Sequence, residues 1–468
     1  MNFQAFTLSK NPEWACIQVK AHESENRVPV HLVCVIDTSA SMESHNKLEN
    51  VKKSLQFLLD FLGPQDMISV ITFSEKAKTI LSQINVNDKD DIRSRISFIR
   101  IESNTNLSAG IIEANSSLLQ GTAYKQGILL LTDGLANMGV INSDGILTIV
   151  QSTIATFNTS ISCIGYGTDH NVELLQNISS TGGGSYYVVN NLEDVATVFG
   201  DILGGLVSCV AQQVKIVLPI GTEVKSRYAT NKVGCMEIII GDIPAGMEAA
   251  FLAKIPVQFP VELKGYDIKN NAPFVIYSNV IATDNATLQL NGEAHYLRFE
   301  VVRLLDESHT LLVQYPIPDF TNQIEKIDAC IKTITDYTVT HSLWGMLLEE
   351  LNTCKKSLQS RDGNYDTPQI MRQHAGYIGT MRGLRATSDN TNYRQMEVES
   401  TFSNNLQRQF SNQLTATVSE SQANESTDTQ HEMIPLTRQN ADSRAYNPDN
   451  SDLEETKNAS WFSNIIGW

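Results

Sequence analysis

The stretch VHLVCVIDTSASMESHNKLENVKKSLQFLLDFL, residues 30–62, opens on a nearly continuous apolar run and then changes abruptly to Asp37-Thr38-Ser39-Ala40-Ser41. An apolar strand without polar alternation is typical of a parallel sheet that is covered on both faces. The segment that follows has the periodicity of an amphipathic helix. These residues therefore predict a buried strand, a polar loop at its carboxyl end and a helix close behind.

The same alternation of strand and helix continues from residue 28 to residue 207. Short apolar runs predict strands at 30–37, 67–73, 77–81, 127–132, 159–166 and 185–189. Helical patterns lie between and after them, at 46–62, 87–100, 107–120, 142–156, 170–180 and 191–207. We therefore expect residues 28–207 to form a doubly wound α/β domain with a mostly parallel sheet.

The flanking segments predict a second kind of sheet. Residues 208–300 contain short runs such as CMEIIIGDI and HYLRFEVVRLL, which are separated by turn residues at roughly ten-residue spacing. This pattern is typical of an antiparallel β-sandwich. The segment EWACIQVKA near the N-terminus also resembles a strand. We expect residues 1–27 to join the same sandwich, which makes the α/β domain an insertion.

The last third of the chain changes to helical periodicity. Residues 301–415 are expected to form a helical region, and residues 416–468 a disordered tail that is rich in polar side chains. The apolar stripes of the helices are Ile324, Ile327, Ile331 and Ile334, then Leu343, Leu347, Leu351 and Leu358, then Phe402, Leu406, Phe410 and Leu414. The tail ends in WFSNIIGW, which is either a short docking motif or a sticky terminus.

Composition excludes several classes of partner and favours one compartment. The formal net charge of -17 argues against binding to nucleic acid or to an anionic membrane. No apolar run approaches the roughly 20 residues of a membrane span, and the N-terminus lacks the pattern of a secretory signal. The seven cysteines form no Cys-x-x-Cys pair, which favours free thiols in a reducing compartment. We therefore expect an intracellular, cytoplasmic protein.

Polar side chains gather where the predicted parallel strands end. Asp37, Ser39 and Ser41 follow the first strand and can turn toward one point, Thr105 precedes a helix, and Asp133 follows a later strand. Ligands of α/β sheets bind at the carboxyl ends of the strands. Carboxylate and hydroxyl oxygens suit a hard cation such as Mg²⁺ or Mn²⁺.

These residues carry a resemblance to a known family. Asp37-x-Ser39-x-Ser41, Thr105 in NTNLSAG and Asp133 in LTDG resemble the metal-ion-dependent adhesion site of the von Willebrand factor A-type (vWA) domain. The resemblance covers residues 28–207. It implies that Ser39, Ser41 and Thr105 bind the ion through their hydroxyls, with Asp37 and Asp133 acting directly or through water. The family often has Gly-Gly where this chain has Ser103-Asn104.

The downstream region is more loosely similar to two kinds of vWA protein. Its segment RQHAGYIGTMRGLRATS looks like the C-terminal part of plant vWA-RING ubiquitin ligases and of vWA-Hint proteins. The chain departs from both, because it has no Cys/His cluster for a RING module and no room for a Hint domain.

The resemblance implies a binding function. An octahedral ion held by two carboxylates and three hydroxyls keeps a position for an Asp or Glu of a partner protein. We therefore expect a Mg²⁺-dependent protein-binding scaffold and no enzyme. Two alternatives stay open: a metal-dependent hydrolase with His45 as its base, and a metal-independent scaffold with a vestigial site.

Overall fold

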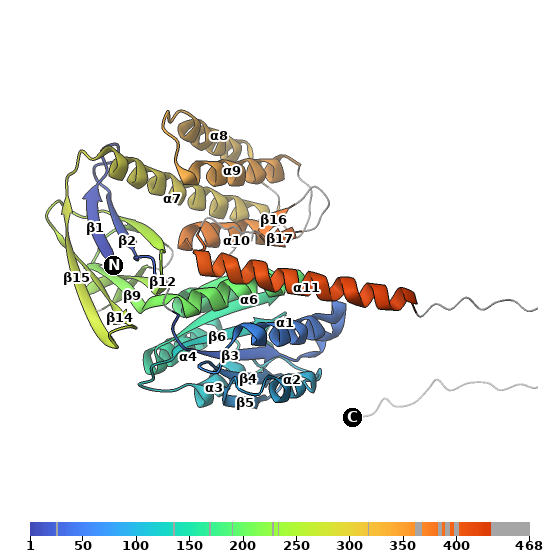
Figure 1. The fold of residues 1–468 in the computed structure, drawn as a ribbon. Helices are drawn as coiled ribbons and strands as arrows, with labels where there is room; N and C mark the ends of the chain where they lie inside the picture. The colour runs from blue at the N-terminus through green and yellow to red at the C-terminus, as the bar shows by residue number, and fades with distance from the viewer. Residues whose placement is uncertain are drawn as a thin grey trace, which may run out of the picture. The chain divides into compact units, whose positions relative to one another are not determined.

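The strand of the opening stretch lies in the middle of a six-stranded sheet (Figure 1). In this computed structural model, β3 (Val30–Asp37) is buried along its whole length, and the strand order is β5-β4-β3-β6-β7-β8. All neighbours are parallel except β4 and β5. The structure describes residues 1–24, 27–133, 136–167, 170–189, 191–226, 229–232, 234–316, 318–360, 367–381, 386–388, 394–396 and 402–431.

Helices cover both faces of this sheet. Leu32, Cys34 and Ile36 of β3 belong to one core together with α1, α2 and α6, whereas Val33 and Val35 belong to another core with α3, α4 and α5. The remaining strands are β4 (Met67–Phe73), β5 (Ala77–Asn85), β6 (Lys125–Thr132), β7 (Thr159–Tyr166) and β8 (Gly183–Val189). The helices are η1 (Ala40–Asn46), α1 (Lys47–Phe61), α2 (Lys89–Ser97), α3 (Leu107–Ser117), α4 (Ser143–Phe157), α5 (Val172–Thr181) and α6 (Leu192–Val207). The predicted doubly wound fold is confirmed.

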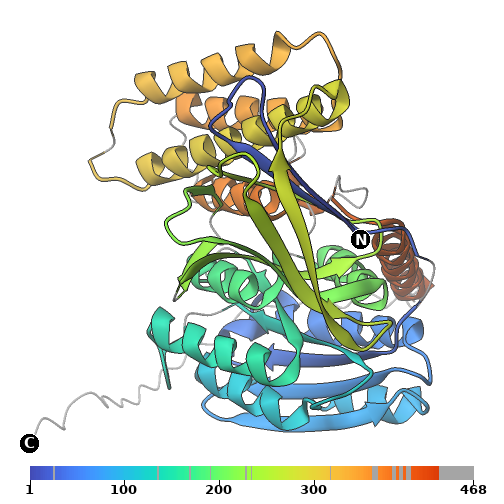
Figure 2. The ribbon, with the colours of Figure 1, turned by 90° about the vertical axis from the view of Figure 1, so that its left-hand side faces the viewer.

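A second sheet is built from the segments that precede and follow the α/β domain in the sequence. Its order is β10-β13-β2-β1-β15-β14-β9-β12-β11. The strands are β1 (Asn2–Thr7), β2 (Ala15–Lys20), β9 (Cys209–Pro219), β10 (Val224–Lys225), β11 (Ala229–Lys232), β12 (Cys235–Pro244), β13 (Glu248–Ala253), β14 (Pro260–Asp267) and β15 (Ala272–Ile281). The N-terminal strands β1 and β2 therefore pair with strands that follow the α/β domain in sequence, as Figure 2 shows.

This sheet folds over on itself as a β-sandwich. Its two halves meet where β1 runs parallel to β15, through the pairs Ala5↔Val280 and Phe6↔Ile281. Ile17 of β2 and Leu263 of β14 lie in the same buried core, although their strands belong to different halves.

The strand predicted at HYLRFEVVRLL is wrong, and so is the predicted end of the β-sandwich at residue 300. The run HYLRFEVVRLL lies inside the helix α7 (Ala286–Leu312), and the last strand before it ends at Ile281. The Asn285 side chain accepts hydrogen bonds from the first backbone amides of α7, which fixes where this helix begins. Buried positions recur at helical spacing along α7, although the aromatic and branched side chains of the run favour a strand locally.

Four helices form the core of the C-terminal region. They are α7, α8 (Thr321–Thr335), α9 (Ser342–Ser360) and α10 (Thr367–Thr380), and β16 (Ala386–Ser388) pairs with β17 (Arg394–Met396) nearby in the sequence. The predicted stripe residues Ile327, Ile334, Leu347 and Leu351 are buried in the core of these helices.

The last helix, α11 (Asn405–His431), does not join those four helices as the sequence suggested. Leu414 and Val418 are buried in the same core as α1 and α6, and the rings of Phe410 and Phe61 lie 5.6 Å apart. The predicted tail is also wrong for residues 416–431, which are helical. Residues 432–468, with the predicted WFSNIIGW motif, lie outside the described residues.

Glycines on α6 allow α11 to approach closely. A Cβ at Gly200 would lie 2.5 Å from the backbone of Ser411, and one at Gly204 would lie 2.5 Å from the Cα of Gln407. The sandwich, the α/β domain and the helices up to residue 422 pack as one unit. Within the described residues, no helix is both long enough and apolar enough to cross a membrane.

Candidate metal centre

The predicted site lies where the strand order of the six-stranded sheet reverses. Asp37 is the last residue of β3, and Asp133 directly follows the neighbouring strand β6. The chain connects β3 onward to β4 on its other side, so the loops after β3 and β6 diverge. Such a switch point at the carboxyl edge forms the ligand-binding crevice of open α/β sheets.

A chain of hydrogen bonds connects four of the five predicted residues. The backbone N–H of Ser39 donates to Asp37 Oδ1 at 2.8 Å, and the hydroxyls of Ser39 and Ser41 lie 3.1 Å apart. The Ser41 hydroxyl donates to Asp133 Oδ1 at 2.6 Å. Side chains that are 92 positions apart in the sequence therefore meet above the sheet.

Thr105, the fifth residue, is held at this edge by its backbone. Its N–H donates to Asn137 Oδ1 at 3.0 Å, and its carbonyl accepts from the Asn137 N–H at 3.0 Å. Ser103, two residues before Thr105, contacts the loop that carries Ser39 and Ser41, because the Ala40 N–H donates to the Ser103 carbonyl. In the described part of the chain, the Thr105 hydroxyl has no hydrogen-bond partner, which leaves its oxygen available to an ion.

The Ser103-Asn104 pair does not strain this loop. Neither residue has a positive φ, so the loop does not require the glycines that the family often has there.

Asp37 is a buried carboxylate that accepts a hydrogen bond on each of its two oxygens. Burial raises the pKa of Asp37 to about 6, and the nearby charge of Asp133 adds to the rise, while hydrogen bonds from Thr132 and Ser39 oppose it. Thr132 Oγ1 donates to the second carboxylate oxygen at 2.5 Å. A buried carboxylate of this kind gains from a bound cation.

Sequence reasoning missed one residue of the site, Lys47. Its ammonium donates to Asp133 Oδ2 at 2.6 Å, and both side chains are buried. A signal was available, because Lys47 is the first residue of α1 and a cation is disfavoured at a helix N-terminus.

The donor set fits a hard divalent cation. It offers two carboxylates and three hydroxyls, and among the described residues no group of three His, Cys, Asp or Glu side chains competes for a metal. Oxygen ligands with few charges suit Mg²⁺ or Mn²⁺ better than the softer metals. Ser39, Ser41, Thr105, Asp37 and Asp133 would hold such an ion.

His45, the candidate base of the hydrolase alternative, lies apart from this set. It is exposed in the bend before α1, with a φ of 53°, and the structure gives no contact between its ring and the five predicted residues. A general base must reach the proton that it removes. His45 therefore offers no positioned base here.

Comparison with known proteins identifies the domain that carries the site. The model of the von Willebrand factor type A domain matches residues 31–201. The uncharacterized protein YfbK of Escherichia coli is 30% identical over 203 residues, which cover 42% of this chain and 35% of YfbK. The E3 ubiquitin-protein ligase WAV3 of Arabidopsis thaliana is 25% identical over 255 residues, which cover 50% of this chain and 32% of WAV3.

A solved structure shows the same fold over most of the chain. The von Willebrand factor type A protein from Catenulispora acidiphila has a TM-score of 0.52 and 14% identity, and the match covers 83% of this chain and 89% of that one. The chain spans only about a third of the length of YfbK and of WAV3. Residues 31–201 of this chain are a von Willebrand factor type A domain.

Proposed function

We propose that this vWA domain binds Mg²⁺ or Mn²⁺ and, through the ion, an acidic side chain of a partner protein. The observation that carries the proposal is the contact of the Asp37 loop with Asp133 through Ser39 and Ser41 at the switch point of the sheet. Helix capping does not explain the serine contacts, because the Ser39 side chain at the start of η1 makes no capping hydrogen bond and the Ser41 hydroxyl donates to Asp133.

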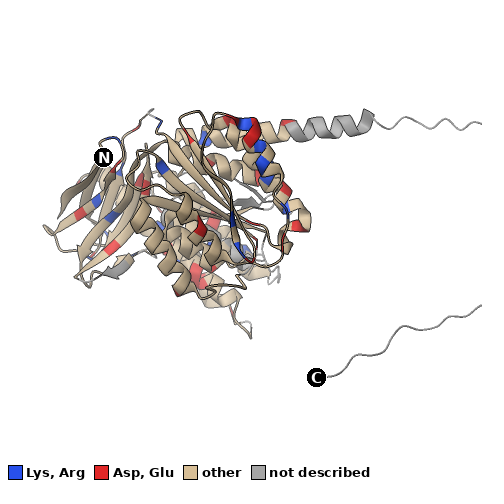
Figure 3. Ribbon diagram, turned by 90° about the horizontal axis from the view of Figure 1, so that it is seen from below, with Lys and Arg blue, Asp and Glu red and all other residues tan. Residues whose placement is uncertain are grey.

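The charge of the site explains the choice of partner. Two carboxylates only neutralise a divalent ion, so the bound ion would remain able to attract a further carboxylate. Acidic and basic positions are interspersed along the described part of the ribbon (Figure 3), and the chain as a whole is acidic. An acidic partner would therefore depend on the ion for its attraction.

We propose binding rather than catalysis. The described site holds hydroxyls and carboxylates that suit an ion, but it lacks a positioned base, since His45 is exposed outside it. A metal-dependent hydrolase needs such a base or a nucleophile beside the ion.

We also propose that the protein works in a reducing compartment. All seven cysteines are free, and six of them are buried. Burial raises the pKa of the Cys34 thiol to about 12, so this thiol is protonated and unreactive at neutral pH.

Calorimetry and pull-down test the proposal together. We expect the wild type to bind one Mg²⁺ per chain, and we expect Asp37→Ala to lose that binding. Pull-down in Mg²⁺ should retain protein partners that are released by EDTA. The Ser39→Ala/Ser41→Ala variant should lose the same partners. Its melting temperature should stay within a few degrees of the wild type, because Asp133 loses the Ser41 hydrogen bond but keeps its ion pair with Lys47.

A truncation after residue 431 is the matched control for the pull-down. It keeps α11, including the buried Val418, which a truncation at residue 415 would remove. We expect this chain to bind the metal-dependent partners as the wild type does. Equal capture in EDTA and by the double serine variant would show that the site is vestigial and that another surface binds partners.

A further inference from the structure

Lys47 occupies one side of the metal centre with its own positive charge. Its Nζ donates to Asp133 Oδ2, while Ser41 donates to Oδ1, so both oxygens of this carboxylate are engaged. The exposed fractions of the two charged side chains are 9% for Lys47 and 0% for Asp133. This is a buried ion pair within the predicted ligand set.

Two features make the position of Lys47 unfavourable for a cation. It is the first residue of α1, where the helix dipole repels positive charge, and it is buried, where an unpaired ammonium is poorly solvated. Its ammonium also lies beside the loop after β7, because a Cβ added at Gly167 would lie 3.9 Å from it. Among the described residues, Asp133 is the carboxylate that pairs with this ammonium.

Lys47 changes the net charge of the site from the value that the five predicted ligands alone would give. Asp37 and Asp133 carry two negative charges when both are ionised, and Lys47 reduces the total to one. Attraction for a divalent ion is weaker as a result. A bound ion is also less neutralised, which strengthens its pull on the carboxylate of a partner.

We propose that Lys47 is an internal cation of the metal centre, which holds Asp133 in place when no ion is bound and lowers the affinity of the site for the divalent ion. This inference rests on the proposed function. It makes Lys47 a positioning residue, because its ammonium acts on the ion through Asp133 and through its charge.

The test combines Mg²⁺ titration with melting in EDTA and in saturating Mg²⁺, on the wild type and on Lys47→Met. Methionine keeps an unbranched apolar side chain and removes the charge. We expect Lys47→Met to bind Mg²⁺ at least about fivefold more tightly than the wild type, because a positive charge that repels the ion is removed. Its melting temperature should fall in EDTA and recover in Mg²⁺, because the ion then neutralises Asp133.

Two variants serve as controls. Lys52→Met removes another buried lysine of α1, whose ammonium contacts Glu49 and the carbonyl of Ile99 instead of Asp133. We expect this variant to keep the Mg²⁺ affinity of the wild type. Lys47→Arg keeps the charge and should also keep that affinity.

The inference would be wrong if Lys47→Met bound Mg²⁺ no more tightly than the wild type and melted lower by the same amount in EDTA and in Mg²⁺. Binding of Mg²⁺ by the wild type in that case would leave the proposed function intact. Absence of binding in both proteins would overturn the inference and the proposed metal site together. If Lys47→Met unfolds in EDTA, refolding on addition of Mg²⁺ supports the inference, and failure to refold contradicts it.

Discussion

At the scale of single residues, two buried charged side chains outside the metal centre hold parts of the chain together. Arg298 on α7 is fully buried and donates to the carbonyls of Ala250, Ile378 and Gly379, at 2.6, 2.6 and 3.1 Å. Burial lowers the pKa of Arg298 to about 9, which leaves it charged at neutral pH. This one side chain therefore connects the sandwich to the end of α10.

Replacing Arg298 by Met should cost about 3 kcal/mol of the free energy of unfolding, because three buried carbonyls lose their donors. Denaturant unfolding measures this loss. Arg303→Met is the control on the same helix, since the Arg303 side chain is 47% exposed and pairs with Glu300 and Glu307. It should cost less than about 1 kcal/mol. Similar losses in the two variants would contradict the role of Arg298.

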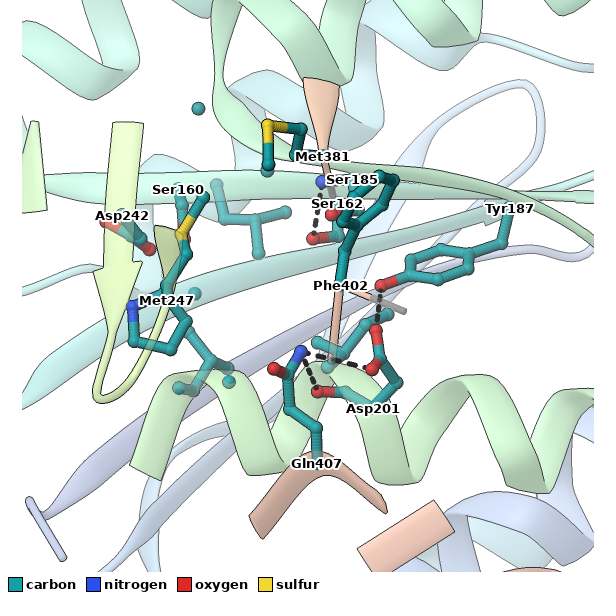
Figure 4. A pocket seen from close by; sticks show the side chains of 18 residues that line it. Ser160, Ser162, Ser185, Tyr187, Asp201, Asp242, Met247, Met381, Phe402 and Gln407 are labelled. Atoms are coloured by element: carbon teal, nitrogen blue, oxygen red, sulfur yellow. Dashed lines mark hydrogen bonds between the residues drawn. The ribbon is translucent and has the colours of Figure 1, made fainter. Parts of the chain in front are cut away.

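The second buried charge, Asp201 on α6, binds the chain that leads into α11 (Figure 4). Its carboxylate accepts hydrogen bonds from the Tyr187 hydroxyl at 2.6 Å, the Ser403 hydroxyl at 2.9 Å and the Gln407 side-chain amide at 3.0 Å. All three donors are neutral. Burial raises the pKa of Asp201 from 3.8 to about 6, against the lowering by Tyr187 and Ser403.

This pKa shift predicts a pH dependence of stability. Because the folded protein holds the Asp201 proton more tightly than the unfolded chain, the stabilisation is complete at low pH and is lost as the pH rises through about 6. Between pH 5 and pH 7 the wild type should lose roughly 1 kcal/mol relative to Asp201→Asn, which does not titrate. Unfolding of both proteins at the two pH values measures the difference. A constant difference would show that Asp201 does not titrate in this range.

At the scale of elements, the docking of α11 on α6 depends on glycine. Gly200→Ala places a methyl group 2.5 Å from the backbone of Ser411, so α11 must move. We expect a loss of about 1–3 kcal/mol and faster proteolysis of α11. Gly205→Ala is the matched control on the same helix, because its methyl group would lie 3.3 Å from its nearest neighbour, the side-chain amide of Gln407, and would not touch the backbone of α11. If the two variants were cleaved at the same rate, the close packing of the helices would not govern the docking of α11.

At the scale of the whole molecule, the N-terminal strands complete a sheet whose other strands lie beyond the vWA domain. In the strand order, β2 and β1 lie between β13 and β15. Deleting residues 1–27 should divide the sheet, expose the edges of β13 and β15, and remove the buried Trp14 and Ile17 from the core. We expect aggregation during size-exclusion chromatography. A soluble monomer that melts cooperatively would show that the sandwich does not need these strands.

The doubly wound domain could be predicted from the sequence because its signals are local. Apolar runs such as residues 30–37 indicate strands that are buried on both faces, and the helices between them keep a regular apolar period. The candidate ligands Asp37, Ser39 and Ser41 could be found for the same reason, since they follow such a run directly. Their metal binding stays a prediction.

Only the tertiary structure decided the features that depend on contacts between distant segments. HYLRFEVVRLL has local preferences for a strand, but the capping by Asn285 and packing against α8–α10 make it a helix. The apolar side chains of α11 could pack on any apolar surface. The glycines of α6 allow α11 to approach the vWA domain closely. Lys47 likewise became part of the site through a contact 86 positions away, with Asp133, because a charge at a helix start gives no indication in the sequence of the partner that neutralises it.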